Sequence, residues 1–281
     1  MASITLKKMS LVAPVKFLHP LPAELGEPKP GNRETSKPLF IFLPGMDGSG
    51  RLYRTQSERL APWFDIRCVA LNPYNKSDWR SLAHQVSQLV VQELNLETSR
   101  RKRSVYLCGE SFGGCLAMQT LTLSPHLFDR VIVVNPASSF RKLPWMQLGP
   151  LITQRLPSMA YRFSSQGMVP FLIEPSRVAR RDRVALASAM ESVPVKTAAW
   201  RMSLLNQFEV ERLPLERMTH PVLLIAGGYD RLLPSTREVK SLQARFPNAQ
   251  QLLLPRSGHA CLLEIETNLL EILKQHQFLP T

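Results

Sequence analysis

One serine lies in a pattern that is typical of a nucleophile. Ser111 stands between Gly109 and Gly113, in the spacing Gly-x-Ser-x-Gly. Such a serine sits on a tight turn from a strand into a helix, where glycine lets neighbouring backbone approach closely. An apolar run at 105–108 precedes the pattern, and a helical spacing of apolar residues begins at Phe112. We therefore predict that Ser111 is a catalytic nucleophile; an inert serine in a glycine-rich turn is the alternative.

A serine hydroxyl is a weak nucleophile and needs a base within hydrogen-bond reach. In enzymes with this turn, the order along the chain is serine, acid, histidine. His259 lies between the last expected strand and the last expected helix, in a loop that opens at the same sheet edge as Ser111. His220 precedes a strand, and His276 lies in the C-terminal tail. We predict that His259 is the base rather than a structural histidine.

The acid that orients the histidine should lie at the same sheet edge. Asp230 closely follows the apolar run 222–225, whereas Asp129 begins a strand and Asp182 lies in a segment without strands. We therefore predict that Asp230 is the acid. Its alternative role is to cap the helix that follows, although Ser235 is well placed for that.

Two backbone N–H groups should stabilise the oxygen that becomes negatively charged during the reaction. Phe112 supplies one of them, because it follows the serine at the start of a helix. The loop 44–50 supplies the other, where Gly45 allows the backbone to turn and Met46 is the predicted donor. A flexible glycine turn without this role is the alternative, and Asp47 is expected to fix the loop without a chemical role.

Short apolar runs and helical patterns alternate along the chain from about residue 38. Most runs are continuously apolar, which is typical of strands buried on both faces of a parallel sheet. The expected strands are 39–43, 66–71, 105–108, 131–134, 222–225 and 252–254. Helical spacing of apolar residues is present at 82–94 and 262–273. The sequence therefore predicts an α/β fold in which helices flank a mostly parallel central sheet.

A long segment without a clear strand interrupts this alternation, and it is rich in proline, methionine, aromatic residues and arginine. We predict that residues 138–218 form a helical lid, inserted into a core that comprises 1–137 and 219–281. Residues 1–37 are punctuated by proline and are expected to add an edge hairpin.

The formal net charge of +13 favours contact with an anionic partner or surface. We expect no nucleic acid, because the basic residues are mostly scattered and no nucleic-acid-binding module is recognisable. The densest basic run, at 100–103, is expected to be a solvated loop. The predicted lid has 12 Lys and Arg against 6 Asp and Glu, so this segment carries a net charge of +6.

The cysteines Cys68, Cys108, Cys115 and Cys261 show no metal-ligand spacing and no CxxC pair. Most lie in or beside apolar segments, so they are expected to be buried and reduced, which favours a cytoplasmic location. Neither a metal nor an organic cofactor is implied. The apolar stretch near the N-terminus is short and broken, and no run approaches the ~18 apolar residues of a membrane span, so at most peripheral membrane contact is expected.

Taken together, these motifs resemble the α/β-hydrolase superfamily from about residue 38 onward. The stretches 42–48, 109–114, 230–235 and 257–259 are similar to esterases, lipases and thioesterases, including the hydrolase part of phytyl ester synthase and diacylglycerol acyltransferase-like proteins. The resemblance implies an α/β-hydrolase fold. Plant members carry a second module with a His-x4-Asp motif, which this sequence lacks, so any acyl transfer would have to use Ser111.

The expected reaction is cleavage of a carboxylic ester or thioester through an acyl-enzyme on Ser111. Apolar lid residues indicate a pocket for a medium or long acyl chain, unless they only pack the lid on the core: Trp145, Met146, Leu148, Leu151, Ile152, Tyr161, Phe163, Met168 and Phe171. Acyl transfer to a lipid alcohol by the same triad is the main alternative. Different chemistry on this scaffold and non-catalytic binding are further alternatives. The expected partners are a small-molecule or lipid acyl substrate and, through the basic lid, an anionic membrane or an acyl carrier.

Overall fold

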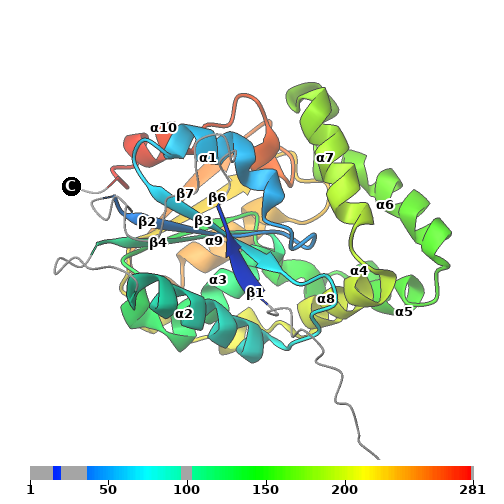
Figure 1. The fold of residues 1–281 in the computed structure, drawn as a ribbon, viewed down its shortest axis with the longest axis horizontal. Coiled ribbons are helices and arrows are strands. Elements are labelled where there is room, and N and C mark those ends of the chain that lie inside the picture. Colours follow the sequence, from blue (N-terminus) through cyan, green and yellow to red (C-terminus); the bar gives the residue numbers. More distant parts are fainter. Residues whose placement is uncertain (1–14, 20–36, 96–102, 280–281) are drawn as a thin grey trace, which may run out of the picture.

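The computed structural model describes residues 15–19, 37–95 and 103–279, which contain one seven-stranded sheet (Figure 1). The strand order is β1-β3-β2-β4-β5-β6-β7. β1 pairs antiparallel with β3, and all the other neighbouring pairs are parallel. The strands are β1 (Val15–Leu18), β2 (Leu39–Leu43), β3 (Asp65–Leu71), β4 (Val105–Glu110), β5 (Arg130–Val134), β6 (Val222–Gly227) and β7 (Ala249–Leu254). The predicted α/β fold with a mostly parallel sheet is therefore confirmed.

Helices cover both faces of the sheet, because successive side chains of a strand point to opposite sides. In β2, Phe40 and Phe42 belong to one buried apolar cluster, and Ile41 and Leu43 belong to another. The covering helices are α1 (Arg54–Leu60), α2 (Trp79–Asn95), α3 (Phe112–Leu123), α9 (Ser235–Gln243) and α10 (Leu269–Gln275). α1 and α10 pack on the Phe40 face, whereas α2, α3 and α9 pack on the opposite face (Figure 1).

The chain between β5 and β6 forms a group of helices at one side of the sheet (Figure 1). They are α4 (Pro144–Gln147), α5 (Gly149–Thr153), α6 (Ser158–Leu172), α7 (Arg180–Glu191) and α8 (Val195–Gln207). α5 packs on α8, and α6 packs on α7. We call this group the inserted segment. That residues 138–218 act as a lid remains a prediction.

The nine apolar side chains expected to line a pocket or pack the inserted segment differ in burial. Met146 and Tyr161 are buried, and Met168 is half-buried. Six others are 49–68% exposed: Trp145, Leu148, Leu151, Ile152, Phe163 and Phe171. In the part of the chain that the structure describes, no helix combines the length and the apolar character needed to cross a membrane.

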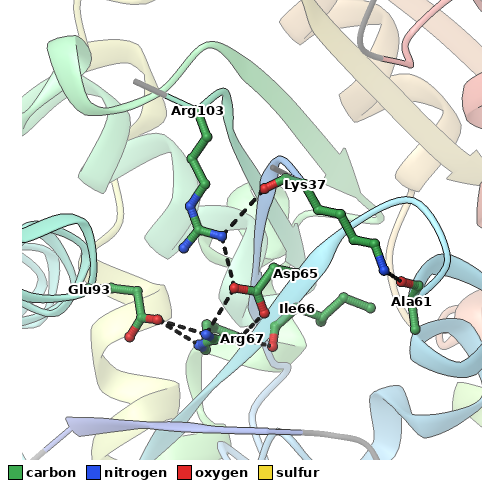
Figure 2. A network of polar contacts seen from close by, with 7 residues as sticks. All are labelled: Lys37, Ala61, Asp65, Ile66, Arg67, Glu93 and Arg103. Carbon is green, nitrogen blue, oxygen red and sulfur yellow. Dashed lines mark hydrogen bonds and ion pairs between the residues drawn. The ribbon is translucent and has the colours of Figure 1, made fainter. Parts of the chain in front are cut away.

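A buried ionic cluster lies where β3 begins (Figure 2). Arg67 is 1% exposed and pairs with Asp65, and its Nη2 atom lies 2.7 Å from Glu93 Oε1. Arg103 Nη1 lies 2.8 Å from the second carboxylate oxygen of Asp65. The prediction of a solvated loop was therefore wrong for Arg103, which is buried because Asp65 neutralises its charge. Residues 100–102 of that basic run lie outside the described residues.

The C-terminal part of the chain departs from the expected pattern. The single helix predicted for 262–273 was wrong, because α10 begins at Leu269, where the Asn268 side chain accepts hydrogen bonds from the first backbone N–H groups. Cys261–Leu263 form a short 3-10 turn instead, and Ile265 is 54% exposed. At the N-terminus, β1 is an antiparallel edge strand, and the rest of the predicted hairpin lies outside the described residues.

Candidate active site

Ser111 lies on the turn that joins β4 to α3. Its backbone has φ = 56° and ψ = −115°, a conformation that side-chain-bearing residues adopt at a cost of about 1–3 kcal/mol. A Cβ atom on Gly109 would lie 2.2 Å from the carbonyl oxygen of Gly113, and one on Gly113 would lie 2.1 Å from that of Leu43. The two glycines therefore permit the close backbone approach that the strained turn requires, in the strand–turn–helix context that the sequence predicts.

His259 connects Ser111 to Asp230. The His259 Nε2 atom lies 2.8 Å from Ser111 Oγ, and its Nδ1 atom lies 2.7 Å from Asp230 Oδ2. A carboxylate only accepts hydrogen bonds, so Nδ1 carries the proton and Nε2 accepts from the serine hydroxyl. The structure thus brings the three side chains together from loops that follow β4, β6 and β7. Their catalytic roles remain predictions.

Asp230 is held by several hydrogen bonds of its own. Its Oδ1 atom accepts from the backbone N–H groups of Leu232 and Leu233, both at 2.9 Å. Its Oδ2 atom accepts from the Ser235 hydroxyl as well as from His259. In this described stretch, Pro234 occupies the N-cap of α9 without a side-chain cap, so the expectation that Ser235 caps the helix was wrong. The Ser235 hydroxyl instead orients the carboxylate.

The electrostatics of the pair favour a charged imidazole. Burial alone lowers the pKa of His259, but the Asp230 carboxylate, the hydrogen bond to it and the nearby Glu110 together raise this pKa above its ordinary value. Burial alone raises the pKa of Asp230, but His259 and the hydrogen bonds to the carboxylate lower it below its ordinary value. An imidazolium that forms during a reaction is therefore stabilised by its surroundings.

Asn135 supports the histidine loop and was not identified from the sequence. It follows β5 with φ = 41°, and its Nδ2 atom donates to the carbonyl oxygens of His259 at 2.6 Å and Gly258 at 3.2 Å. Its Oδ1 atom accepts from Gly227 N–H at 2.7 Å, at the end of β6. One side chain thus links the loops of the base and the acid. A polar residue directly after an apolar strand was the available signal.

The predicted oxyanion donors flank Ser111. Gly48 N–H donates to the Gly45 carbonyl at 3.0 Å, which closes a turn with Met46 at its centre. A Cβ atom on Gly45 would lie 3.8 Å from Ser111 Cβ, so this turn lies beside the nucleophile. Phe112 is the first residue of α3, where a backbone N–H has no partner within its helix. That these two groups form an oxyanion hole remains a prediction.

The histidine and aspartate that the sequence analysis rejected as base and acid, His220 and Asp129, hydrogen-bond to backbone groups away from the site. His220 Nε2 lies 3.0 Å from the carbonyl oxygen of Pro125, ahead of β6. Asp129 accepts a hydrogen bond from Val105 N–H at 2.7 Å, at the start of β4. Because the proposed triad lies at the opposite ends of these strands, neither side chain belongs to the site.

Glu110, within the glycine–serine motif, is a second carboxyl near His259 that the sequence did not single out. Its Oε1 atom is buried and has no hydrogen-bond partner among the described residues. Burial raises the pKa of Glu110 to about 7, although His259 and a hydrogen bond from the Leu262 backbone act to lower it. No local pattern signals this burial, because it depends on the packing of the segment around Leu262.

Comparisons with known proteins agree with this geometry. A family model described as "Alpha/beta hydrolase family" matches residues 40–268. Phytyl ester synthase 1, chloroplastic, from Arabidopsis thaliana is 27% identical over 261 residues, which cover 84% of this chain and 36% of that protein. The pimeloyl-[acyl-carrier protein] methyl ester esterase of Pectobacterium atrosepticum is 25% identical over 233 residues, covering 79% and 87% respectively.

Among solved structures, an esterase from Exiguobacterium antarcticum superimposes with a TM-score of 0.69 at 15% identity, covering 85% of this chain and 91% of that chain. Likeness at this identity shows the fold alone. The chain spans little more than a third of the length of the two Arabidopsis relatives that it matches, phytyl ester synthases 1 and 2. The family model, however, spans most of the chain and includes Ser111, Asp230 and His259. The chain therefore belongs to the alpha/beta hydrolase family.

Proposed function

We propose that this enzyme cleaves carboxylic esters or thioesters through an acyl-enzyme on Ser111. The observation that carries the proposal is the hydrogen-bonded chain from Ser111 through His259 to Asp230. In the first step, Ser111 Oγ attacks the carbonyl carbon while His259 Nε2 takes the hydroxyl proton and then gives it to the leaving alcohol or thiol. In the second step, His259 activates a water molecule that releases the acid and restores Ser111.

The tetrahedral intermediate of each step carries a negative oxygen. In this mechanism the N–H groups of Met46 and Phe112 donate to that oxygen, and loss of one such donor typically costs about 3 kcal/mol of transition-state stabilisation. The position of the Gly45 turn beside Ser111 supports this assignment.

The proposed substrate carries a medium or long acyl chain and is presented at an anionic surface. Exposed apolar side chains follow one another along α4 and α5: Trp145 on α4, Leu148 between the two helices and Ile152 on α5. Exposed Arg155 and Arg180 lie in the same inserted segment, and such a combination suits an anionic lipid bilayer. An acyl carrier is the alternative source, supported by similarity to an esterase whose name includes such a carrier. A cytoplasmic location, at most peripheral to a membrane, remains a prediction.

Acyl transfer to a lipid alcohol is the second candidate function. Similarity to phytyl ester synthase 1, which is named for ester formation, favours it. The same acyl-enzyme would then be released by an alcohol instead of water.

The test uses a long-chain p-nitrophenyl ester with the wild type and with Ser111→Ala. We expect intact-mass detection of one acyl group in the wild type, and a loss of turnover on the order of 10⁴-fold or more in the variant. Ser124→Ala, just after the same helix, is the matched control and should behave like the wild type. If the wild type neither forms an acyl-enzyme nor turns over esters of several chain lengths, the enzyme does not have the proposed activity.

Two further measurements separate the finer proposals. In the first, a long-chain alcohol is added to the reaction and the products are identified. A hydrolase still produces the free acid, whereas a new ester would identify a transferase. Flotation with phosphatidylcholine vesicles, with and without phosphatidylglycerol, tests the lipid surface. We expect binding only to the anionic vesicles and its loss in Trp145→Ser. Equal binding to both kinds of vesicle, or to neither, would contradict the anionic-surface proposal.

A further inference from the structure

Arg201 connects the inserted segment to the turn that follows β2. It lies on α8, is 2% exposed, and is among the largest fully buried side chains. Its Nη1 atom donates to the carbonyl oxygen of Met46 at 2.7 Å and to that of Asp47 at 3.0 Å. These partners lie 155 and 154 positions earlier in the chain, so the contact joins two parts of the fold that sequence separates widely.

The guanidinium group fits closely against this turn. Gly48 has φ = 66°, and a Cβ atom there would lie 2.7 Å from Arg201 Nη1 and 2.9 Å from Nη2. A side chain at this position would therefore force the guanidinium group to shift. Nη1 holds the carbonyl groups of Met46 and Asp47, and therefore restricts rotation of the two peptide groups that directly follow the one carrying the Met46 N–H.

The guanidinium group of Arg201 does not form an ion pair with the Asp47 carboxylate. The Asp47 carboxylate accepts hydrogen bonds from the backbone N–H and hydroxyl of Ser49 instead. Burial lowers the pKa of Arg201, while the nearby Asp47 and the Tyr161 hydroxyl of α6 raise it. The Nη2 atom is buried without a hydrogen-bond partner among the described residues. A buried cation with so little compensation is costly for folding, so a role outside stability explains its presence better.

We propose that Arg201 is a positioning residue that holds the Met46 N–H toward the oxyanion formed on Ser111. The inference rests on the proposed function and extends it, because formation of the oxyanion hole then requires α8 to be docked against the Met46 turn. The inserted segment thereby takes part in chemistry without touching the reacting atoms. The positive charge behind the turn also favours negative charge on the oxygen at its front.

The experiment compares a ligand that forms an oxyanion with one that does not. A long-chain trifluoromethyl ketone forms a hemiketal with Ser111 whose oxygen is negatively charged, whereas the matching trifluoromethyl alcohol binds without one. In Arg201→Met we expect inhibition by the ketone to weaken about 10- to 100-fold and kcat to fall by a similar factor. KM and inhibition by the alcohol should change little. Arg201→Lys, which keeps a donor and the charge, should restore part of the loss.

The matched control is Arg183→Met, because Arg183 Nη1 also donates to a backbone carbonyl, that of Pro175, within the inserted segment. This variant should keep the wild-type ratio of ketone to alcohol affinity. An unchanged ratio in both Arg201 variants, with the wild type active, would overturn the Arg201 proposal alone. If the wild type itself shows no Ser111-dependent turnover, the proposed function fails, and the role of Arg201 fails with it.

Discussion

At the scale of single residues, the Glu110 carboxylate has opposite effects on the stability of the fold and on the protonation of His259. Its carboxyl group is buried beside His259 and near Asp47, and its other electrostatic neighbours are Tyr53, Cys108 and Cys261. A buried carboxylate that lacks a full set of partners destabilises the folded state when it is ionised. The same negative charge, however, favours the protonated form of the neighbouring histidine.

The first prediction concerns stability. The pKa of Glu110 is raised from 4.5 to about 7, so the folded state binds more protons than the unfolded state between these values. Wild-type stability is therefore reduced as pH rises through this window. Glu110→Gln should gain up to about 3 kcal/mol relative to the wild type at pH 8 and little at pH 4.5. Urea unfolding at both pH values measures this, and an equal gain at both would contradict the assignment.

The second prediction concerns the pH dependence of the rate. A base must be unprotonated to act, so kcat/KM should fall on the acid side as His259 becomes protonated. Because Glu110 helps to raise the pKa of His259, Glu110→Gln should move this acid limb to lower pH. Glu271→Gln, on the exposed surface of α10, should leave it in place. If the acid limb of the kcat/KM profile lies at the same pH in both variants as in the wild type, Glu110 does not influence the pKa of His259.

At the scale of elements, the turn from β4 to α3 sets the position of the nucleophile. Gly113, in the first turn of α3, packs so closely on the end of β2 that an added Cβ would meet the carbonyl oxygens of Leu43 and Pro44. The same contact brings Ser111 next to the Met46 turn, because that turn begins where β2 ends. A single close approach thus fixes the distance between the nucleophile and a proposed oxyanion donor.

The third prediction follows from this approach. Gly113→Ala should destabilise the fold by about 3 kcal/mol, because backbone and not a flexible side chain occupies the space. The folded fraction should also turn over the ester more slowly, since β2 and its turn must shift. Gly167→Ala, on α6, is the control: nothing lies within 4 Å of its added Cβ, and the helix should gain up to about 1 kcal/mol. Thermal unfolding with turnover per folded molecule measures both effects.

At the scale of the whole molecule, the proposed active site and the buried ionic cluster lie at opposite ends of the sheet. The proposed triad follows the carboxyl ends of β4, β6 and β7, whereas Asp65, Arg67 and Glu93 form their cluster near the amino end of β3 (Figure 2). Because the strands between them are rigid and buried, a change in the cluster should affect stability and leave the site's geometry intact.

The fourth prediction tests this separation. Arg67→Met removes the cation shared by the carboxylates of Asp65 and Glu93, and we expect a loss of about 3–5 kcal/mol in the free energy of unfolding. The double variant Arg67→Met/Glu93→Leu should recover part of this loss, because it removes both charges. Turnover per folded molecule should remain at the wild-type level in both. A change in kcat, with folding intact, would show that the two ends of the sheet are coupled.

The sequence was sufficient for features that depend on short stretches of chain. Six runs of apolar residues predict the six parallel strands, because a strand buried on both faces needs apolar side chains throughout. The motif around Ser111 and the chain order of Ser111, Asp230 and His259 predict a site at the carboxyl edge of the sheet. The run predicted for β7 covered only 252–254, because the strand begins at Ala249 and its Gln250 and Gln251 are exposed. The predicted start of α10 was wrong, because the helix begins where Asn268 caps it and not where the apolar spacing begins.

Other features are decided by tertiary structure, because they depend on groups that are distant in sequence. Asn135 reaches the His259 loop across more than 120 positions, and Arg201 reaches the Met46 turn across 155. Ser235 bonds to Asp230 instead of capping its helix, and Arg103 is buried because Asp65 lies opposite it. The sequence by itself therefore determines which side chains are candidates for the site and at which sheet edge they emerge. Only the packed fold decides which polar groups hold them in place, since a buried hydrogen bond has no local signature.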